Sequence, residues 1–175
     1  MRALVAARHV DPPDWLIGAG AIRTAVWDRL HGYAMRTPLA DIDLGFYDPH
    51  DLSEEREQEI RRMLEQALPG EVWDVKNQAA VHLWYPEKFG YEVEPLASTA
   101  DAIATFPETA VCVGLRLRGD DTLSIEAPYG LGDLFGLIHR RNPARVSVEE
   151  YERRLTAKRI TERWPRVTVI AASEA

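Results

Sequence analysis

The chain has 175 residues, of which 46% are hydrophobic and 28% charged. This is the composition of an ordinary globular protein, and the length suits one domain with a core of its own. Its net charge of −7 argues against non-specific binding to DNA and favours a small-molecule or nucleotide substrate, leaving only a local basic groove as a route to nucleic acid.

The cysteine content and the apolar segments bear on the compartment. The single cysteine, Cys112, lies in an apolar run and excludes a disulfide framework. The apolar segment 3–7 is too short for a signal peptide, and no apolar run approaches the length of a membrane span. We therefore expect a cytoplasmic protein with no membrane partner.

The first predicted elements are a helix, a strand and a second helix. Residues 1–10 favour a short helix that ends before Pro12 and Pro13. Residues 15–18 are typical of a buried strand, and the apolar spacing from Ala21 onward predicts a helix that ends at Gly32.

The turn between this strand and helix is Gly18-Ala19-Gly20. Glycines let a ligand approach the backbone, and free N–H groups at a helix start attract phosphate oxygens. Tight packing of helix on strand is the alternative reason for small residues here. Arg23, one turn into the helix, is predicted either to hold a phosphate or neutralise nearby carboxylates, or to be an ordinary surface arginine.

Asp41-Ile42-Asp43 predicts a second strand with two carboxylates on one face. Alternate residues of a strand project to the same side, roughly 6 to 7 Å apart. Two such like charges suit Mg²⁺, which takes oxygen ligands and completes its shell with water and substrate phosphates. The alternative is an edge strand whose polar face is simply hydrated.

The next elements are a scaffold helix, a third strand and a helix with a polar start. Residues 51–68 predict an amphipathic helix capped by Asp51, with Met63 on its apolar face. Residues 71–76 predict a strand that contains Asp74, and 77–85 predict a helix. Lys76 is a candidate phosphate ligand, whereas His82 is predicted either to bind a base or to be structural, and Asn77 and Gln78 have no assigned role.

The sequence after residue 95 predicts both helices and strands. We expect a helix from an N-cap at Ser98 or Thr99, a hairpin of strands 110–117 and 122–126, and helices 134–138 and 148–163. Arg140 and Arg141, in the basic turn after 138, would contact a triphosphate or an RNA end, or simply complement a helix C-terminus.

Several strings resemble those of the nucleotidyltransferase superfamily that includes DNA polymerase beta, in a bacterial branch described only as nucleotidyltransferase family proteins. Besides the order strand, Gly turn, helix and Asp-x-Asp strand, the resemblance rests on strings that span most of the chain. They are residues 18–23, 26–32, 41–43, 75–79, 82–85 and 127–131.

The resemblance implies an α+β (mixed α/β) fold, with a central mixed sheet and helices mainly on one face. It implies a single nucleotidyltransferase-like domain over 1–175, with its core at about 14–90 and with 95–175 completing it. One departure is that Gly-Ala-Gly stands where many relatives carry Gly-Ser, which removes a hydroxyl that could contact phosphate.

The implied activity is transfer of a nucleoside monophosphate from an NTP to an unknown acceptor hydroxyl, with Mg²⁺ or Mn²⁺ and release of pyrophosphate. The acceptor would be a small molecule, a protein or an RNA end. Asp41, Asp43 and Asp74 would be the catalytic and metal-binding residues, since a two-metal site suits three carboxylates; Asp74 as a strand-end residue is the alternative. Nucleotide binding would fall to Gly18, Ala19, Gly20, Arg23 and Lys76. A non-catalytic nucleotide- or partner-binding module is the alternative function.

Overall fold

The computed structural model describes residues 1–172. The elements of the first half are α1 (Arg2–Val10), β1 (Leu16–Gly18), α2 (Ala19–His31), β2 (Ile42–Phe46), α3 (Glu54–Ala67), β3 (Trp73–Asn77), η1 (Gln78–Ala80) and α4 (Val81–Phe89). Those of the second half are α5 (Thr99–Ala104), η2 (Thr109–Val111), β4 (Gly114–Leu117), β5 (Leu123–Glu126), α6 (Gly132–Phe135), β6 (Ile138–His139), α7 (Val148–Lys158), α8 (Ile160–Arg163) and β7 (Thr168–Val169).

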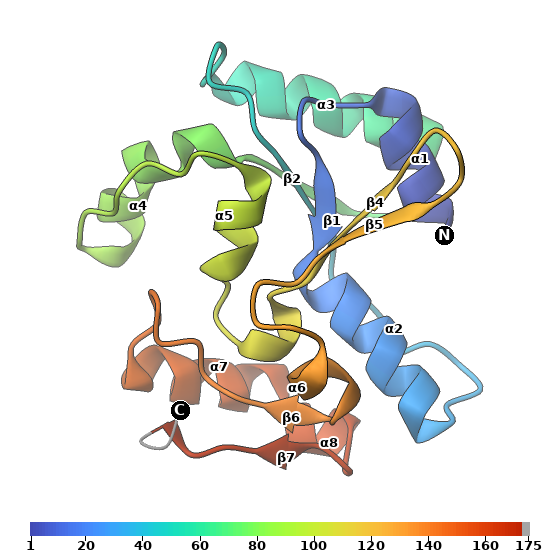
Figure 1. The fold of residues 1–175 in the computed structure, drawn as a ribbon, viewed down its shortest axis with the longest axis vertical. Coiled ribbons are helices and arrows are strands. Elements are labelled where there is room, and N and C mark those ends of the chain that lie inside the picture. Colours follow the sequence, from blue (N-terminus) through green and yellow to red (C-terminus); the bar gives the residue numbers. More distant parts are fainter. Residues whose placement is uncertain (173–175) are drawn as a thin grey trace.

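A five-stranded mixed sheet organises the fold, with strand order β3-β2-β1-β4-β5 (Figure 1). β1 lies in the middle and pairs antiparallel with both β2 and β4, whereas β2 and β3 are parallel. The parallel pair is joined through α3, as a parallel connection requires a crossover. The predicted mixed α and β fold is confirmed.

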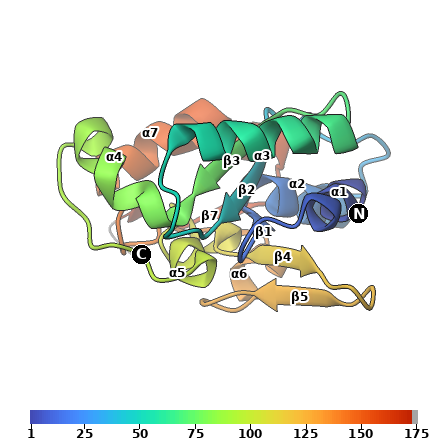
Figure 2. The same ribbon diagram turned by 90° about the horizontal axis from the view of Figure 1, so that it is seen from above.

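The two faces of the sheet have different environments. Ile42, Leu44 and Phe46 of β2 are buried in a core cluster with residues of α1 and α3. Figure 2 shows α1 and α3 covering this side of the sheet. The alternate residues Asp43 and Gly45 face the opposite side. On that side Leu16 of β1 packs against Ile103 of α5.

A second core joins α2 to the C-terminal elements. Trp27 of α2 and Trp164, just after α8, are fully buried there, with ring centroids 5.4 Å apart in an edge-on arrangement. The indole Nε1 of Trp164 donates a hydrogen bond of 2.8 Å to Asp28. In Figure 1 the C-terminal elements lie below the sheet, with α7 facing α4 and α5 from below.

Several local expectations are confirmed. Gly32 ends α2 with a positive φ of 71°, Ser98 caps α5 by accepting a hydrogen bond from the Asp101 N–H, and β4 and β5 form the predicted antiparallel hairpin. Among residues 1–172, no helix combines the length and apolar composition needed to cross a membrane.

Other local expectations are wrong. Ser53, not Asp51, caps α3, because its hydroxyl accepts the Arg56 N–H while Asp51 accepts from Ser53. Met63, predicted to face the core, is 42% exposed. The strand predicted over 110–117 begins only at Gly114, because a 3-10 turn precedes it.

The C-terminal predictions need two further corrections. The helix predicted over 134–138 ends at Phe135 and is followed by β6, so that Ile138 lies in a strand. The long helix predicted over 148–163 is divided at Arg159, whose φ of 50° is left-handed and therefore ends α7 before α8 begins.

Candidate active site

Two carboxylates lie side by side on the polar face of the sheet. Asp43 of β2 and Asp74 of β3 are register partners in the parallel pair. Their neighbours in each strand are buried apolar residues, so the alternation of buried and partly buried positions fixes both aspartates on the face away from α3. The family resemblance implied that these two residues lie close together, and the structure places them side by side.

Asp41 lies just outside β2 and is exposed. Burial, together with the negative charges of Asp41 and Asp74, raises the pKa of Asp43 to about 6. All three carboxylates therefore act on one region of space. Among residues 1–172, no group of three or more His, Cys, Asp or Glu side chains is arranged to hold a metal ion.

The glycine turn adjoins Asp43, but much of it serves packing. A Cβ on Gly18 would lie 2.9 Å from Ile103 Cδ1 and 3.2 Å from Phe106, so a side chain at this position would have to displace the side chains packed against it. Ala19 has a φ of 54°, a strained value for a residue with a side chain. The backbone N–H of Gly20 acts as a donor toward Asp43 and lowers its pKa.

Arg23 is not the surface arginine of the alternative interpretation, since it is only 3% exposed. Its guanidinium carbon lies 5.3 Å from the ring centroid of Trp27 and 5.4 Å from that of Trp164. Burial lowers its pKa, while the negative charges of Glu108 and Asp43 raise it. Its Nε is buried without a hydrogen-bond partner among residues 1–172.

Lys76 and Asn77, at the end of β3, are held by neighbouring elements. Lys76 Nζ lies 3.0 Å from Glu57 of α3, and the lysine side chain remains 45% exposed. Asn77 is completely buried; its amide contacts backbone groups of Asp48, Asp51 and Ala79. Asn77 is therefore structural.

The polar face of the sheet opens into a cleft of about 900 Å³, which Asp43, Asp74 and Lys76 line. Gly18, Ala19, Gly20, Arg23 and Asp41 lie outside its lining. The structure therefore brings together in the cleft three of the predicted site residues and places the other five around it.

Aromatic side chains of α4 and the loop after it form one side of the cleft, here called the aromatic wall: Trp84, Tyr85, Phe89 and Tyr91. Tyr85 and Phe89 have ring centroids 4.4 Å apart, and Tyr91 packs edge-on against Tyr85 at 5.3 Å. Lys88 lies 5.4 Å from the Trp84 ring. Such faces can stack on a planar base.

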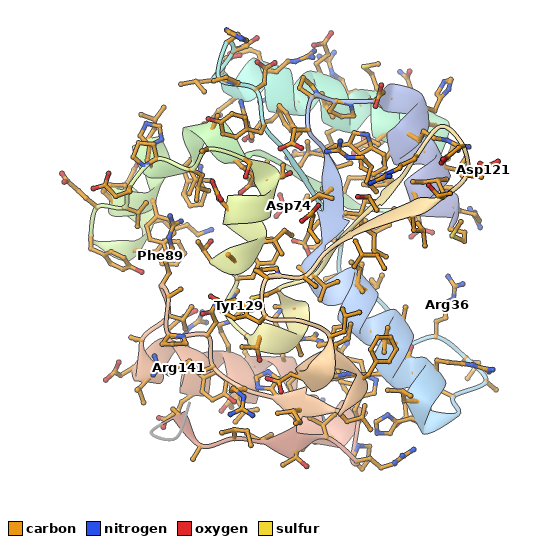
Figure 3. The ribbon with its side chains drawn as sticks, in the orientation of Figure 1. Arg36, Asp74, Phe89, Asp121, Tyr129 and Arg141 are labelled. Carbon is orange, nitrogen blue, oxygen red and sulfur yellow. The ribbon has the colours of Figure 1, made fainter. Side chains whose placement is uncertain are left out.

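Arginines line the C-terminal side of the cleft, here called the arginine wall: Arg141, Arg145 and Arg154. Arg154, on α7, donates from Nε to Glu108 at 2.8 Å. Figure 3 shows Arg141 below Asp74, with Phe89 at the far end of α4. Arg140 does not belong to the wall, because it is paired with Asp133 at 3.0 Å.

The aromatic wall, Arg145 and Arg154 were missed as components of the site, whereas Arg141 was already a candidate contact of a triphosphate or an RNA end. The aromatic run 84–91 carried a signal, since four aromatic residues surround Lys88. Arg154 carried none, because on an amphipathic helix it is indistinguishable from its exposed neighbour Arg153. His82, at the start of α4, lies outside the cleft lining, and its Nδ1 is buried without a partner among residues 1–172.

The mixed sheet and its adjacent carboxylates define a nucleotidyltransferase-type fold. A family model described as nucleotidyltransferase matches residues 5–169, and the chain therefore belongs to the nucleotidyltransferase family. The resemblance noted in the sequence is thus confirmed. A search of curated protein sequences returned no match.

Solved structures with a similar fold include CCA-adding enzymes. The chain is similar to a CCA-adding enzyme head domain determined by NMR, with 27% identity and a TM-score of 0.78 over 96% of this chain and 87% of that one. It also resembles a CCA-adding enzyme in complex with CTP, at 16% identity and a TM-score of 0.59, and an apo form at 15% and 0.55. Both matches extend over 98% of this chain but over only 40% and 41% of the two enzymes. At this low identity the two structures show the fold alone.

Proposed function

We propose that the protein is a divalent-metal-dependent nucleotidyltransferase that transfers a nucleoside monophosphate from an NTP to an acceptor hydroxyl and releases pyrophosphate. The observation that carries this proposal is the pairing of Asp43 with Asp74 at the cleft. Membership of the nucleotidyltransferase family supports the reaction class.

The carboxylates fit a hard divalent cation. Burial is the main cause of the raised pKa of Asp43, and the negative charges of Asp41 and Asp74 contribute to it. A cation between the aspartates would offset these charges. Mg²⁺ usually needs only one or two carboxylates, because water and substrate phosphates supply its other ligands. Asp43 and Asp74, with Asp41 beside them, would hold Mg²⁺ or Mn²⁺, which when bound would polarise the reacting phosphate and the acceptor oxygen.

The protein's own residues would orient the reactants. Asp74 would accept the proton of the acceptor hydroxyl, since its carboxylate faces the cleft. The aromatic wall would bind the planar base of the nucleotide. The CTP complex of the CCA-adding enzyme with the same fold supports an NTP as the ligand of this cleft.

A labelled-substrate screen tests the proposal. Purified protein is incubated with each of the four α-labelled NTPs and Mg²⁺ or Mn²⁺, and with small-molecule mixtures, total RNA or no added acceptor. We expect pyrophosphate release and transfer of label to one acceptor class, both abolished by EDTA and by Asp43→Asn. Binding of NTP without pyrophosphate release under every condition would instead identify a non-catalytic binding module.

A further inference from the structure

The groups predicted to bind phosphate are mostly engaged elsewhere. Gly18 is packed against Ile103 and Phe106, and the N–H of Gly20 is directed toward Asp43. Lys76 is paired with Glu57. A bound Mg²⁺ or Mn²⁺ would offset part of the charge of the triphosphate. The remaining charge calls for other cations in the cleft, because it must be offset once the triphosphate leaves water.

Arg141 and Arg154 are the cations of the cleft whose surroundings favour this role. Arg145 lies over the Tyr85 ring at 5.5 Å, and Lys88 lies over Trp84, so both already contact the aromatic wall. Arg141 donates from one terminal nitrogen to the Val146 carbonyl at 2.8 Å, while its Nε is buried with no partner in the described part of the chain.

Arg154 is held rigidly and carries positive charge that is only partly offset. Its partner Glu108 is 1% exposed, and the same carboxylate is the main negative charge acting on buried Arg23. The positive charges of Arg23 and Arg154 are therefore offset mainly by the single carboxylate of Glu108. Arg154 lines the same cleft as Asp43 and Asp74, and an anion bound there would offset the excess positive charge.

We propose that Arg141 and Arg154 bind the β- and γ-phosphates of the NTP and the pyrophosphate that leaves. This inference rests on the proposed function and assigns the terminal phosphates to the arginine wall, not to the glycine turn. A guanidinium fork matches two phosphate oxygens, and Glu108 orients Arg154 before the nucleotide arrives, which reduces the entropy lost on binding. The α-phosphate would then lie nearer to the carboxylates.

The test is a set of calorimetric dissociation constants measured with Mg²⁺ for ATP, CTP, GTP and UTP, followed by the monophosphate of the tightest binder. Arg141→Gln and Arg154→Gln should each weaken NTP binding about 10- to 100-fold, the range expected for a charged hydrogen bond, and change monophosphate binding less than about 3-fold. The matched control is Arg153→Gln, which removes the same charge from an adjacent residue that is 67% exposed and outside the cleft.

Folding of the variants needs a separate control, because Arg154→Gln leaves Glu108 buried without its partner. The double variant Glu108→Gln/Arg154→Gln removes both charges, and Arg154→Lys keeps the cation. We expect the double variant to recover thermal stability while NTP binding stays weak, and the lysine variant to bind NTP more tightly than the glutamine variant.

The outcomes separate this inference from the proposed function. Unchanged NTP affinity in folded Arg141→Gln and Arg154→Gln would overturn the phosphate assignment, as would equal weakening of monophosphate binding. If wild type still releases pyrophosphate in either case, the proposed function stands. A wild-type protein that binds no NTP would overturn both.

Discussion

Asp43 and Asp74 are direct neighbours across the parallel strands β2 and β3, so two like charges share one face of the sheet. Removing one charge by Asp43→Asn should relieve repulsion and leave the metal-free stability unchanged or raise it by up to about 2 kcal/mol. The same variant should lose pyrophosphate release and the stabilisation by Mg²⁺ with NTP. Chemical denaturation and a pyrophosphate assay measure both effects.

Glu65→Gln is the matched control, since it removes one carboxylate from an exposed position of α3. It should leave activity and ligand stabilisation unaltered. If Asp43→Asn unfolds more easily than wild type without metal, or retains turnover, Asp43 is a structural residue and the site assignment is wrong.

The two glycines of the Gly-Ala-Gly turn should respond in opposite directions. Gly18→Ala would force a methyl group against Ile103, Phe106 and the Val113 carbonyl, and should cost about 1 to 3 kcal/mol of unfolding free energy. A Cβ at Gly20 meets no atom within 4 Å, and alanine in a helix should leave stability unchanged or raise it by up to about 1 kcal/mol. Equal loss in both variants would contradict the packing role of Gly18.

Asn77 should matter for stability far more than its neighbour Gln78. Asn77→Ala would remove four side-chain hydrogen bonds from buried surroundings and should lower the free energy of unfolding by about 3 to 4 kcal/mol. Gln78 makes one such bond, to the Lys76 carbonyl, so Gln78→Ala should cost less than about 1 kcal/mol. Urea denaturation of the two variants measures both losses of unfolding free energy. Similar losses would refute this ranking.

His139 should make stability depend on pH. Its pKa is lowered to about 4, mainly by burial and also by the positive charges of Arg23, Arg154 and Lys158, which together outweigh the opposing effect of Glu108. Between about pH 6.5 and 4 the unfolded chain binds a proton that the folded chain does not, so unfolding free energy should fall as pH falls through this window. The total loss should be about 3 kcal/mol.

The comparison variant for this effect is His139→Gln, which cannot titrate but can still hydrogen-bond Tyr151, the wild-type partner at 2.9 Å. Denaturation at several pH values from 6.5 to 4.5 should give a shallower slope for the variant than for wild type. Parallel slopes would show that His139 titrates normally.

The sequence was informative wherever local periodicity determines structure. Local patterns were enough to predict the strands that carry Asp43 and Asp74. That the two carboxylates share one face of the sheet was implied only by the family resemblance, because no local pattern shows how two strands pair. Gly32 and Ser98 were likewise predictable, because helix ends have chemical requirements that neighbouring residues reveal.

Long-range contacts were beyond the same reasoning. Arg23 could be given a position on its helix, but not its burial against Trp164, which lies far away in the chain and reaches it only through the C-terminal fold. Arg154 was hidden for the same reason, whereas Arg141 was already a candidate triphosphate contact. Arg154 joins the cleft because Glu108, 46 positions earlier, holds it there, and no local pattern records that pairing.

The central place of β1 has a consequence for the growing polypeptide on the ribosome. One edge of β1 pairs with β2, but the other can pair only after β4 has been synthesised. The side chain of Arg116 in β4 donates a hydrogen bond to the Trp15 carbonyl, which lies 101 positions earlier in the sequence. At typical synthesis rates this edge stays open for roughly 5 to 20 seconds after β1 emerges. A chain that stalls before β4 exposes a free edge of its central strand, so nascent fragments of this length are the ones expected to need protection from aggregation.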